Sequence, residues 1–542
     1  MAKSAKVGIA SAHVLLAGFV LASTSALAPQ IAAAQDSRTD WPSYNRTLAS
    51  DRYSPLDEIN RTNVAKLHQL CVYDLGLQTE FEPGPLVIGR TLYATSEMDI
   101  VAIDADTCQE KWRTHEDIQL PYRHFPTNRG AAFLDGKLFR GTQDGRVFAY
   151  DAENGKKLWE TKILHMRGES VPAAPIAWNG MVFVGNAGGD QKGVKGRMYG
   201  LDAATGKIMW QTYLVPAQGE SGSGPEEKVA APTWGNAEDV PITGGATWTS
   251  YTLDTERGLL YVPGGNPAPD FNKKLRPGAN LFAGSVVVLD AKTGEYRRHF
   301  SLVPQDFHDW DVSAAPALIT TKGGKHLLAD AGKNGLLYGI DLATGKHLYE
   351  TPITKRENTT APLVEKGTRF CPGAGGGTEW NGPAYSPQTN LIYDGTVDRC
   401  STVTSVEDDD VKAVPEGLAW TGAIKEAPFG KTDPTWSGWL NATDADSGKV
   451  KWRYHAVAPV LSGVTPTKGG LVFAGDMGGN AFAFDAATGK QLWHIQLDGA
   501  PGGGLITYAI EGHQRVAIVS GTNSQVFDLA PKGNAKITIF GL

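Results

Sequence analysis

Short runs of apolar residues recur along the chain, and each leads through a tight polar turn into a second run that closes on a large side chain. The clear copies are AIDADTCQEKW (102–112), AYDAENGKKLW (149–159), GLDAATGKIMW (200–210), VLDAKTGEYRR (288–298), GIDLATGKHLY (339–349), ATDADSGKVKW (442–452) and AFDAATGKQLW (483–493). The aspartate can hydrogen-bond the backbone of its own turn, and the glycine suits a position with positive φ. Each copy therefore predicts a β-hairpin.

The spacing of these hairpins predicts how they assemble. Neighbouring copies begin about 40 to 50 residues apart, apart from two roughly doubled gaps. Within those gaps, SYTLDTERGLLY (250–261) and AYSPQTNLIY (384–393) resemble degenerate copies of the same hairpin. A repeat of this length built from short strands is typical of a β-propeller. We predict an all-β fold, a single eight-bladed β-propeller over residues 35–542, in which the repeated tryptophans dock one blade on the next.

The first 34 residues have the pattern of a secretory signal peptide. Lys3 and Lys6 precede the apolar stretch VLLAGFVLASTSALA, and the small residues of IAAAQ follow, so we expect cleavage after Ala34. A retained anchor is the alternative, but the apolar run is short for a membrane span, and no comparable run follows. We therefore expect a periplasmic protein with no membrane span in the mature chain.

Charge and cysteine content narrow the function classes. The formal net charge is −7, and removing the two leader lysines makes it −9, which argues against a nucleic-acid-binding protein. Four cysteines in an exported chain favour two disulfides. Three pairings are open, and we favour the local ones, Cys71–Cys108 and Cys371–Cys400. The sequence holds no CxxCH, so we expect no covalently bound haem.

Candidate functional residues lie where insertions interrupt the repeat, at 115–131, 186–198, 217–248, 264–281, 304–316 and 371–382. These segments are rich in acids, amides, glycines and tryptophans. Asp190, Asn266, Asp309 and Asp311 offer the oxygen ligands that Ca²⁺ prefers, although each alone is more typical of a turn or cap. On a strand, Asp309 and Asp311 would share a face, where they repel unless a cation lies between them or they share a proton.

Three motifs carry a family resemblance: TGGATWTSY (243–251), GGNPAPDFN (264–272) and DFHDWDVSAAP (306–316). Together with the repeat, they resemble the quinoprotein alcohol dehydrogenases, periplasmic eight-bladed propellers that use pyrroloquinoline quinone (PQQ) and a metal. The resemblance covers the chain from DWPSYNRT (40–47) to the final blade. It implies that Asp309 is the general base, which takes the hydroxyl proton of an alcohol while hydride passes to C5 of the quinone. The metal would polarise a quinone oxygen.

The resemblance also implies a metal site. Asn266 and Asp309 match family ligands, and Asp190 matches a family glutamate with a side chain longer by one methylene. Asp311 lies where lanthanide-using members carry an additional carboxylate, and glucose-dehydrogenase-like members carry an aspartate there too. We expect Ca²⁺ first, with a lanthanide as the alternative.

For PQQ itself, the resemblance assigns a stacking surface and charged contacts. Trp248 matches the tryptophan under the rings, Arg129 a partner of a cofactor carboxylate, and Lys333 the cation near the quinone oxygens. The remaining expected cofactor contacts are Glu82, Gly188, Gly189, Glu379 and Trp380.

Several positions depart from the family pattern. Arg123 and His124 replace two adjacent cysteines that roof the cofactor, Pro172 and Ala187 replace a threonine and a serine, and Glu379 replaces an asparagine. The altered pocket favours secondary alcohols, polyols or bulky alcohols as substrates. Cys371 and Cys400 match one family disulfide in context and spacing.

Without haem on the chain, we expect a periplasmic cytochrome c or another external acceptor to receive the electrons. The alternatives are an aldose or polyol dehydrogenase with the same chemistry, and a binding or assembly propeller without cofactor.

Overall fold

The computed structural model describes residues 39–118, 125–220, 225–423, 430–527 and 531–542. The expected signal peptide, its cleavage site after Ala34, and the Arg123–His124 pair lie outside these described residues. Within them, no helix is long and apolar enough to cross a membrane.

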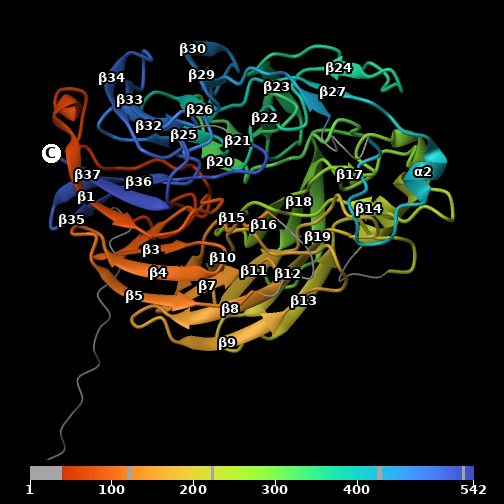
Figure 1. Ribbon diagram of the computed structural model, residues 1–542, viewed down its shortest axis with the longest axis horizontal. Coiled ribbons are helices and arrows are strands. Elements are labelled where there is room, and N and C mark those ends of the chain that lie inside the picture. Colours follow the sequence, from red (N-terminus) through yellow and green to blue (C-terminus); the bar gives the residue numbers. More distant parts are fainter. Residues whose placement is uncertain (1–38, 119–124, 221–224, 424–429, 528–530) are drawn as a thin grey trace, which may run out of the picture. The chain divides into compact units, whose positions relative to one another are not determined.

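The described residues form eight four-stranded antiparallel sheets, and Figure 1 shows these sheets following one another in chain order around a ring. The first three are β2 (Leu86–Ile88), β3 (Thr91–Thr95), β4 (Asp99–Asp104) and β5 (Glu110–His115); β6 (Ala132–Leu134), β7 (Lys137–Gly141), β8 (Arg146–Asp151) and β9 (Lys157–Lys162); and β10 (Ile176–Trp178), β11 (Met181–Gly185), β12 (Arg197–Asp202) and β13 (Ile208–Tyr213). The fourth and fifth are β15 (Thr252–Asp254), β16 (Leu259–Pro263), β18 (Ser285–Asp290) and β19 (Tyr296–Ser301); and β20 (Ala317–Thr320), β21 (His326–Ala331), β22 (Leu336–Asp341) and β23 (His347–Pro352). The sixth and seventh are β25 (Ala384–Ser386), β26 (Leu391–Gly395), β29 (Gly438–Asp444) and β30 (Val450–Ala456); and β31 (Thr465–Pro466), β32 (Leu471–Asp476), β33 (Asn480–Asp485) and β34 (Gln491–Gln496).

The eighth sheet joins the two ends of the described chain. Its order is β1 (His68–Asp74), β37 (Lys536–Gly541), β36 (His513–Ser520) and β35 (Leu505–Ile510). The Cys71–Cys108 disulfide links its outer strand to the turn between β4 and β5 of the first sheet.

This pairing and Cys371–Cys400 are the two that we favoured, and both are confirmed. An all-β propeller is likewise confirmed.

The seven clear repeats are the hairpins between the third and fourth strands of the first seven sheets. The two degenerate copies are a different hairpin, because they form β15–β16 and β25–β26, the first two strands of their sheets. Our interpretation of them as further copies was therefore wrong. The doubled gaps contain long insertions, and the eighth blade comes from the chain ends, where the repeat motif is absent.

The repeated tryptophans dock the blades, as predicted. The indole Nε1 of Trp112 donates a hydrogen bond to the carbonyl of Ala152 in the next sheet (3.2 Å), and Trp210 does the same to Ala291 (3.1 Å). Each ring also covers the repeat glycine of the next hairpin: a Cβ on Gly155 would lie 2.5 Å from the Trp112 ring. Gly155 has a φ of 71°, so turn geometry and blade packing both require glycine there.

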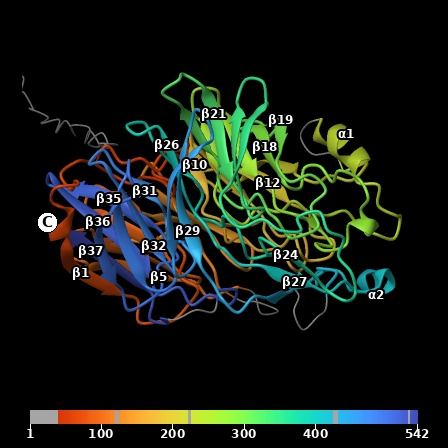
Figure 2. The same ribbon diagram turned by 90° about the horizontal axis from the view of Figure 1, so that it is seen from above.

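The insertions carry the remaining elements. These are η1 (Val64–Lys66), α1 (Glu226–Ala230), η2 (Ala231–Thr233), the pair β14 (Thr243–Gly244) and β17 (Pro267–Ala268), η3 (Lys273–Leu275), α2 (Asp408–Lys412), and a sheet of β24 (Thr368–Phe370), β27 (Ser401–Val403) and β28 (Lys431–Thr432). Figure 2 shows α1 and α2 at the same end of the ribbon, away from β35–β37.

Candidate active site

One cavity of about 500 Å³ gathers residues from the insertions of many blades. All of the residues that the sequence analysis singled out for catalysis, cofactor or metal line it, namely Glu82, Arg129, Gly188, Gly189, Asp190, Trp248, Asn266, Asp309, Asp311, Lys333, Glu379 and Trp380. Pro172 and Ala187 line it too. These positions span about 300 residues of sequence, so only the closed ring of blades can bring them together.

The segment 304–316 is irregular, as expected for an insertion that interrupts the repeat, so Asp309 and Asp311 do not lie on a strand. Its shape is set by Asp306, whose carboxylate accepts hydrogen bonds from the backbone N–H groups of His308 (3.1 Å) and Trp310 (3.0 Å). Asp309, between them, has a left-handed φ of 63°. A buried carboxylate thus holds a turn that directs Asp309 and Asp311 into the cavity.

Lys333 lies between the two aspartates. Its Nζ is 3.3 Å from Oδ2 of Asp309 and 2.9 Å from Oδ2 of Asp311, and all three side chains are buried. Burial lowers the pKa of Lys333, but the two carboxylates outweigh it and hold that pKa well above its usual value. The mutual repulsion of Asp309 and Asp311 is therefore relieved by a cation that the chain itself supplies.

Asp309 also belongs to a second group of carboxylates. Oxygen atoms of Asp190, Asp270 and Asp309 all lie within 4.8 Å of one another. Asn266 joins this group, because its Nδ2 donates to Oδ1 of Asp270 (3.0 Å) and its backbone N–H donates to Oδ1 of Asp311 (2.8 Å). The sequence analysis missed Asp270, although it lies inside the quoted motif GGNPAPDFN, four residues after Asn266.

The electrostatics of this group favour a cation. Burial raises the pKa of Asp309 well above its usual value, against the effect of Lys333, and the neighbouring Asp311 and Asp190 raise it further. Burial and then Asp311 raise the pKa of Asp190 to about 6. Burial is the largest cause of both shifts and the neighbouring acids add to it, and a bound cation would oppose both effects.

The opposite part of the cavity combines aromatic rings with a buried ion pair. The guanidinium of Arg129 lies over the rings of Trp248 and Trp380, 4.8 and 4.9 Å from their centroids. It pairs with Glu82 at 2.8 Å and donates to the carbonyl of Trp248 at 3.2 Å. Burial raises the pKa of Glu82 well above normal, and Arg129 only partly opposes this. A planar anionic group would find both a ring to stack on and a cation here.

Glu379 adds another acid to the cavity. Burial raises its pKa to about 7, with Lys333 opposing and Asp311 adding to the shift. Its neighbour Trp380 is fixed by a hydrogen bond from Nε1 to the carbonyl of Gly502 (2.8 Å). On another wall, Gly188 has a φ of 101°, and a Cβ there would lie 2.1 Å from the carbonyl oxygen of Gly168. Only glycine fits this close approach of two backbones.

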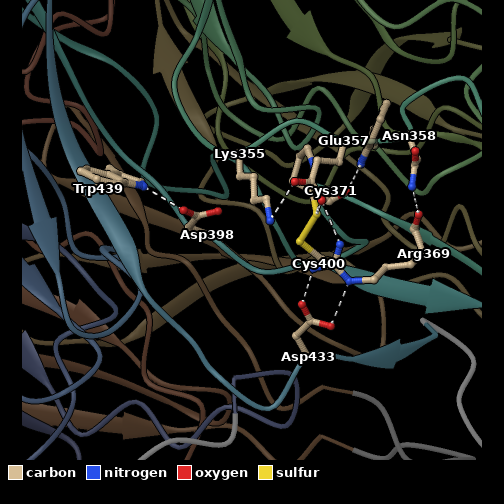
Figure 3. The surroundings of a disulfide bond; sticks show 11 residues. Lys355, Glu357, Asn358, Arg369, Cys371, Asp398, Cys400, Asp433 and Trp439 are labelled. Carbon is tan, nitrogen blue, oxygen red and sulfur yellow. Dashed lines mark hydrogen bonds and ion pairs between the residues drawn. A yellow bond between two sulfur atoms is a disulfide. The ribbon is translucent and has the colours of Figure 1, made fainter.

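The Cys371–Cys400 disulfide anchors one wall of the cavity (Figure 3). The segments beside it, 373–375 and 399–401, supply lining residues. Figure 3 shows Arg369 to the right of the disulfide, where it pairs with Glu357 at 2.9 Å and with Asp433 at 2.7 Å. Covalent and ionic links thus hold the loops of this wall together.

The lining also includes apolar residues with solvent exposure. Phe125 is 43% exposed and Val526 is 36% exposed, and both line the cavity together with Trp436 and Phe527. The guanidinium of Arg399 stacks on Trp436, 3.2 Å from the ring centroid. We refer to Phe125, Trp436, Val526 and Phe527 as the apolar rim.

The residues present fit PQQ and a metal. The cavity has the size of a small-molecule site and offers a stacking surface, the cationic side chains of Arg129, Lys333 and Arg399, and oxygen donors of the kind that a hard cation takes. Unpartnered buried atoms point to the same conclusion: within the described residues, Nε of Arg129 and Oδ2 of Asp270 have no hydrogen-bond partner.

Comparisons with known proteins show the family to which the chain belongs. The family model for the glucose/ethanol/alcohol dehydrogenase β-propeller domain, which bears the name PQQ, matches residues 41–359, and a model for the outer membrane protein assembly factor BamB matches 437–530. The chain is 32% identical to the quinohemoprotein alcohol dehydrogenase ADH-IIG of Pseudomonas putida, over 91% of this chain and 74% of that protein. It is 30% identical to the lanthanide-dependent methanol dehydrogenase of Methylacidiphilum fumariolicum, over 96% of this chain and 91% of that protein.

A solved structure gives the same result. The quinohemoprotein alcohol dehydrogenase from Comamonas testosteroni superposes with a TM-score of 0.84 at 28% identity, covering 93% of this chain and 80% of that one. The family model spans more than half of the chain, and the relatives cover nearly all of it. The chain therefore belongs to the family of PQQ-dependent alcohol dehydrogenases.

Proposed function

We propose that this protein is a periplasmic dehydrogenase that oxidises a bulky alcohol to the carbonyl compound, using PQQ and a metal ion held in the cavity, with Asp309 as the general base. The observation that carries the proposal is the convergence on one cavity of every residue to which the sequence assigned a role, from Glu82 to Trp380.

In this proposal, Trp248 provides the surface on which the cofactor rings stack, and Arg129 binds a cofactor carboxylate. Glu82, Gly188, Gly189, Glu379 and Trp380 line the rest of the cofactor space. When bound, PQQ supplies the acceptor for the hydride of the alcohol. Asp190, Asn266, Asp309 and Asp311 are the expected oxygen ligands of the metal, which supplies Lewis acidity. Ca²⁺ and a lanthanide are both candidates for that ion.

Asp309 is the residue that moves a proton. It is buried, so its carboxylate is a stronger base than one in water, and Lys333 holds one of its oxygens at 3.3 Å. We infer that the carboxylate accepts the hydroxyl proton of the substrate. Lys333 keeps Asp309 oriented, and its ion pair with Asp311 at 2.9 Å fixes that second carboxylate as well.

The apolar rim favours one substrate class among those we expected. Phe125, Trp436, Val526 and Phe527 offer aromatic and aliphatic contact to a substrate at the open side of the cavity, and such contact suits an alcohol with a large apolar group better than a polyol or an aldose. An external acceptor, a periplasmic cytochrome c in our proposal, would then reoxidise the enzyme.

The test is reconstitution of the purified chain with PQQ and Ca²⁺ or La³⁺, followed by dye reduction with a panel of alcohols. Bulky aromatic and secondary alcohols should give the highest kcat/KM, and aldoses and polyols the lowest. A preference for aldoses or polyols would contradict a bulky alcohol as substrate and favour the alternative, an aldose or polyol dehydrogenase with the same chemistry. A protein that takes up no quinone would contradict the dehydrogenase proposal altogether and support a binding propeller.

A further inference from the structure

Asp270 is a buried acid in contact with the candidate metal site, and neither the sequence motifs nor the comparisons give it a role. It follows β17 and Pro269, and its side chain is fully buried. Oδ1 accepts one hydrogen bond, from Nδ2 of Asn266 at 3.0 Å. Oδ2 has no partner among the described residues. A buried carboxylate oxygen without a donor is costly, so it requires a positive partner or a proton.

The location of the unpartnered carboxylate points to a positive partner. Oxygens of Asp190, Asp270 and Asp309 lie within 4.8 Å of one another. Oxygens on opposite sides of a Ca²⁺ ion are about 4.6 to 5.2 Å apart, twice the usual metal–oxygen distance, and adjacent ligands are closer. The three carboxylates are therefore already spaced to share one ion, without movement of the backbone.

The loop that carries Asp270 is fixed at several points. The buried Arg276 donates from Nη2 to the backbone carbonyl oxygens of Pro269 (3.0 Å) and Asp270 (3.0 Å). The backbone N–H of Phe271, the next residue, donates to the carbonyl of Thr421 at 2.8 Å. The segment around Thr421 also holds the backbone of Asp190, because the N–H of Trp420 donates to the backbone carbonyl of Asp190 at 2.7 Å. One stretch of chain thus fixes the loops of both acids.

We propose that Asp270 is a direct ligand of the metal ion, and that it shares the ion with Asp190 and Asp309. This inference rests on the proposed function, since it assumes that the cavity binds a metal with the quinone.

The chain offers a matched control in Asp394 on β26. It too is fully buried, accepts one hydrogen bond from an asparagine Nδ2 (Asn441, 2.8 Å), and has a second oxygen without a partner among the described residues. It differs from Asp270 in lying outside the group of carboxylates that Asp190, Asp270 and Asp309 form. Asp270→Asn and Asp394→Asn are therefore the same chemical change, with and without access to the proposed ion.

The experiment measures metal retention directly. Wild type, Asp270→Asn and Asp394→Asn are reconstituted as full chains with PQQ and Ca²⁺, and in parallel with La³⁺. Each is dialysed against buffers of graded free metal, and metal per chain is measured by mass spectrometry. We expect Asp270→Asn to need at least about tenfold more free metal for half occupancy, because an anionic ligand is lost, and Asp394→Asn to behave as wild type.

Half occupancy of Asp270→Asn within about twofold of wild type would overturn the proposal. So would an equal loss in Asp394→Asn, because the effect would then come from burial alone. If Asp270→Asn does not fold, Asp270→Glu should retain the metal and Asp270→Ser should lose it, and equal retention by these two would also overturn it. A wild type that takes up neither quinone nor metal would instead contradict the proposed function.

Discussion

Replacing Asp309 by asparagine removes the proposed base and one anionic ligand of the proposed metal, so the variant is compared with wild type at saturating metal, where the shape of the site is nearly unchanged. The two side chains have the same shape, and asparagine tolerates the left-handed φ of 63° that this position requires. Lys333 loses a contact of 3.3 Å but keeps the shorter one of 2.9 Å to Asp311. The stacking surface at Trp248 lies apart from this change, so we expect folding and PQQ uptake to persist.

The expected kinetic effect follows from the role of the residue. A positioned general base contributes about 10²- to 10⁴-fold to the rate, which corresponds to about 2.7 to 5.4 kcal/mol in the activation free energy. We therefore expect kcat of Asp309→Asn in the dye-linked assay to fall by that factor. Absorbance titration should show that PQQ still binds, and Asp394→Asn, a buried aspartate outside the described lining of the cavity, serves as the control.

One result would refute this reasoning. If Asp309→Asn binds PQQ and metal fully and keeps kcat within about threefold of wild type, a different group takes the proton, since loss of a base costs far more. Loss of quinone uptake together with activity would show that Asp309 acts mainly in assembling the site, which also contradicts the assignment.

Three further predictions concern the scaffold. Trp210→Ala should lower the free energy of unfolding by about 3 to 5 kcal/mol, measured by denaturant titration, because it removes a buried ring and its hydrogen bond to Ala291; a loss below about 1 kcal/mol would count against docking. Burial raises the pKa of Asp394 to about 7, so its contribution to stability should be complete below about pH 4 and fall by up to about 4 kcal/mol as pH rises through 7. The Asp394→Asn variant should lack that pH dependence. If wild type and Asp394→Asn showed the same dependence of the free energy of unfolding on pH, the raised pKa of Asp394 would be excluded. Replacing Cys71 and Cys108 by serine should cost about 2 to 4 kcal/mol, since this disulfide links the last blade to the first; an unchanged unfolding midpoint would show that the ring closes without it.

The fold could be predicted because its rule is local. Each repeat contains the aspartate and glycine of a turn and, in most copies, the tryptophan that packs on the glycine of the next repeat. One repeat therefore specifies both a hairpin and its contact with the next blade. The closing blade could not be found in this way. It pairs β1 with β37, strands from opposite ends of the described chain, and no turn connects them.

The residues of the cavity could be predicted because motifs mark them, whereas their geometry could not. Spacing suggested that Asp309 and Asp311 share a strand face, but Asp306 holds them on an irregular loop through hydrogen bonds to its backbone. The cation between them is Lys333, which lies on a loop after β21 and has no signal in the sequence near the aspartates. Asp270 was missed for the same reason, because only the packed loops show that its carboxylate faces those of Asp190 and Asp309.

The central claim is that the cavity holds PQQ against Trp248 with a metal among the carboxylates. An experimental structure of the chain reconstituted with PQQ and La³⁺ tests it most directly, because anomalous scattering locates the ion independently. The account predicts a quinone stacked on Trp248 and one ion contacting Asp190, Asn266 and Asp309. An ion bound elsewhere, or an empty cavity in protein that is saturated with PQQ in solution, would contradict it.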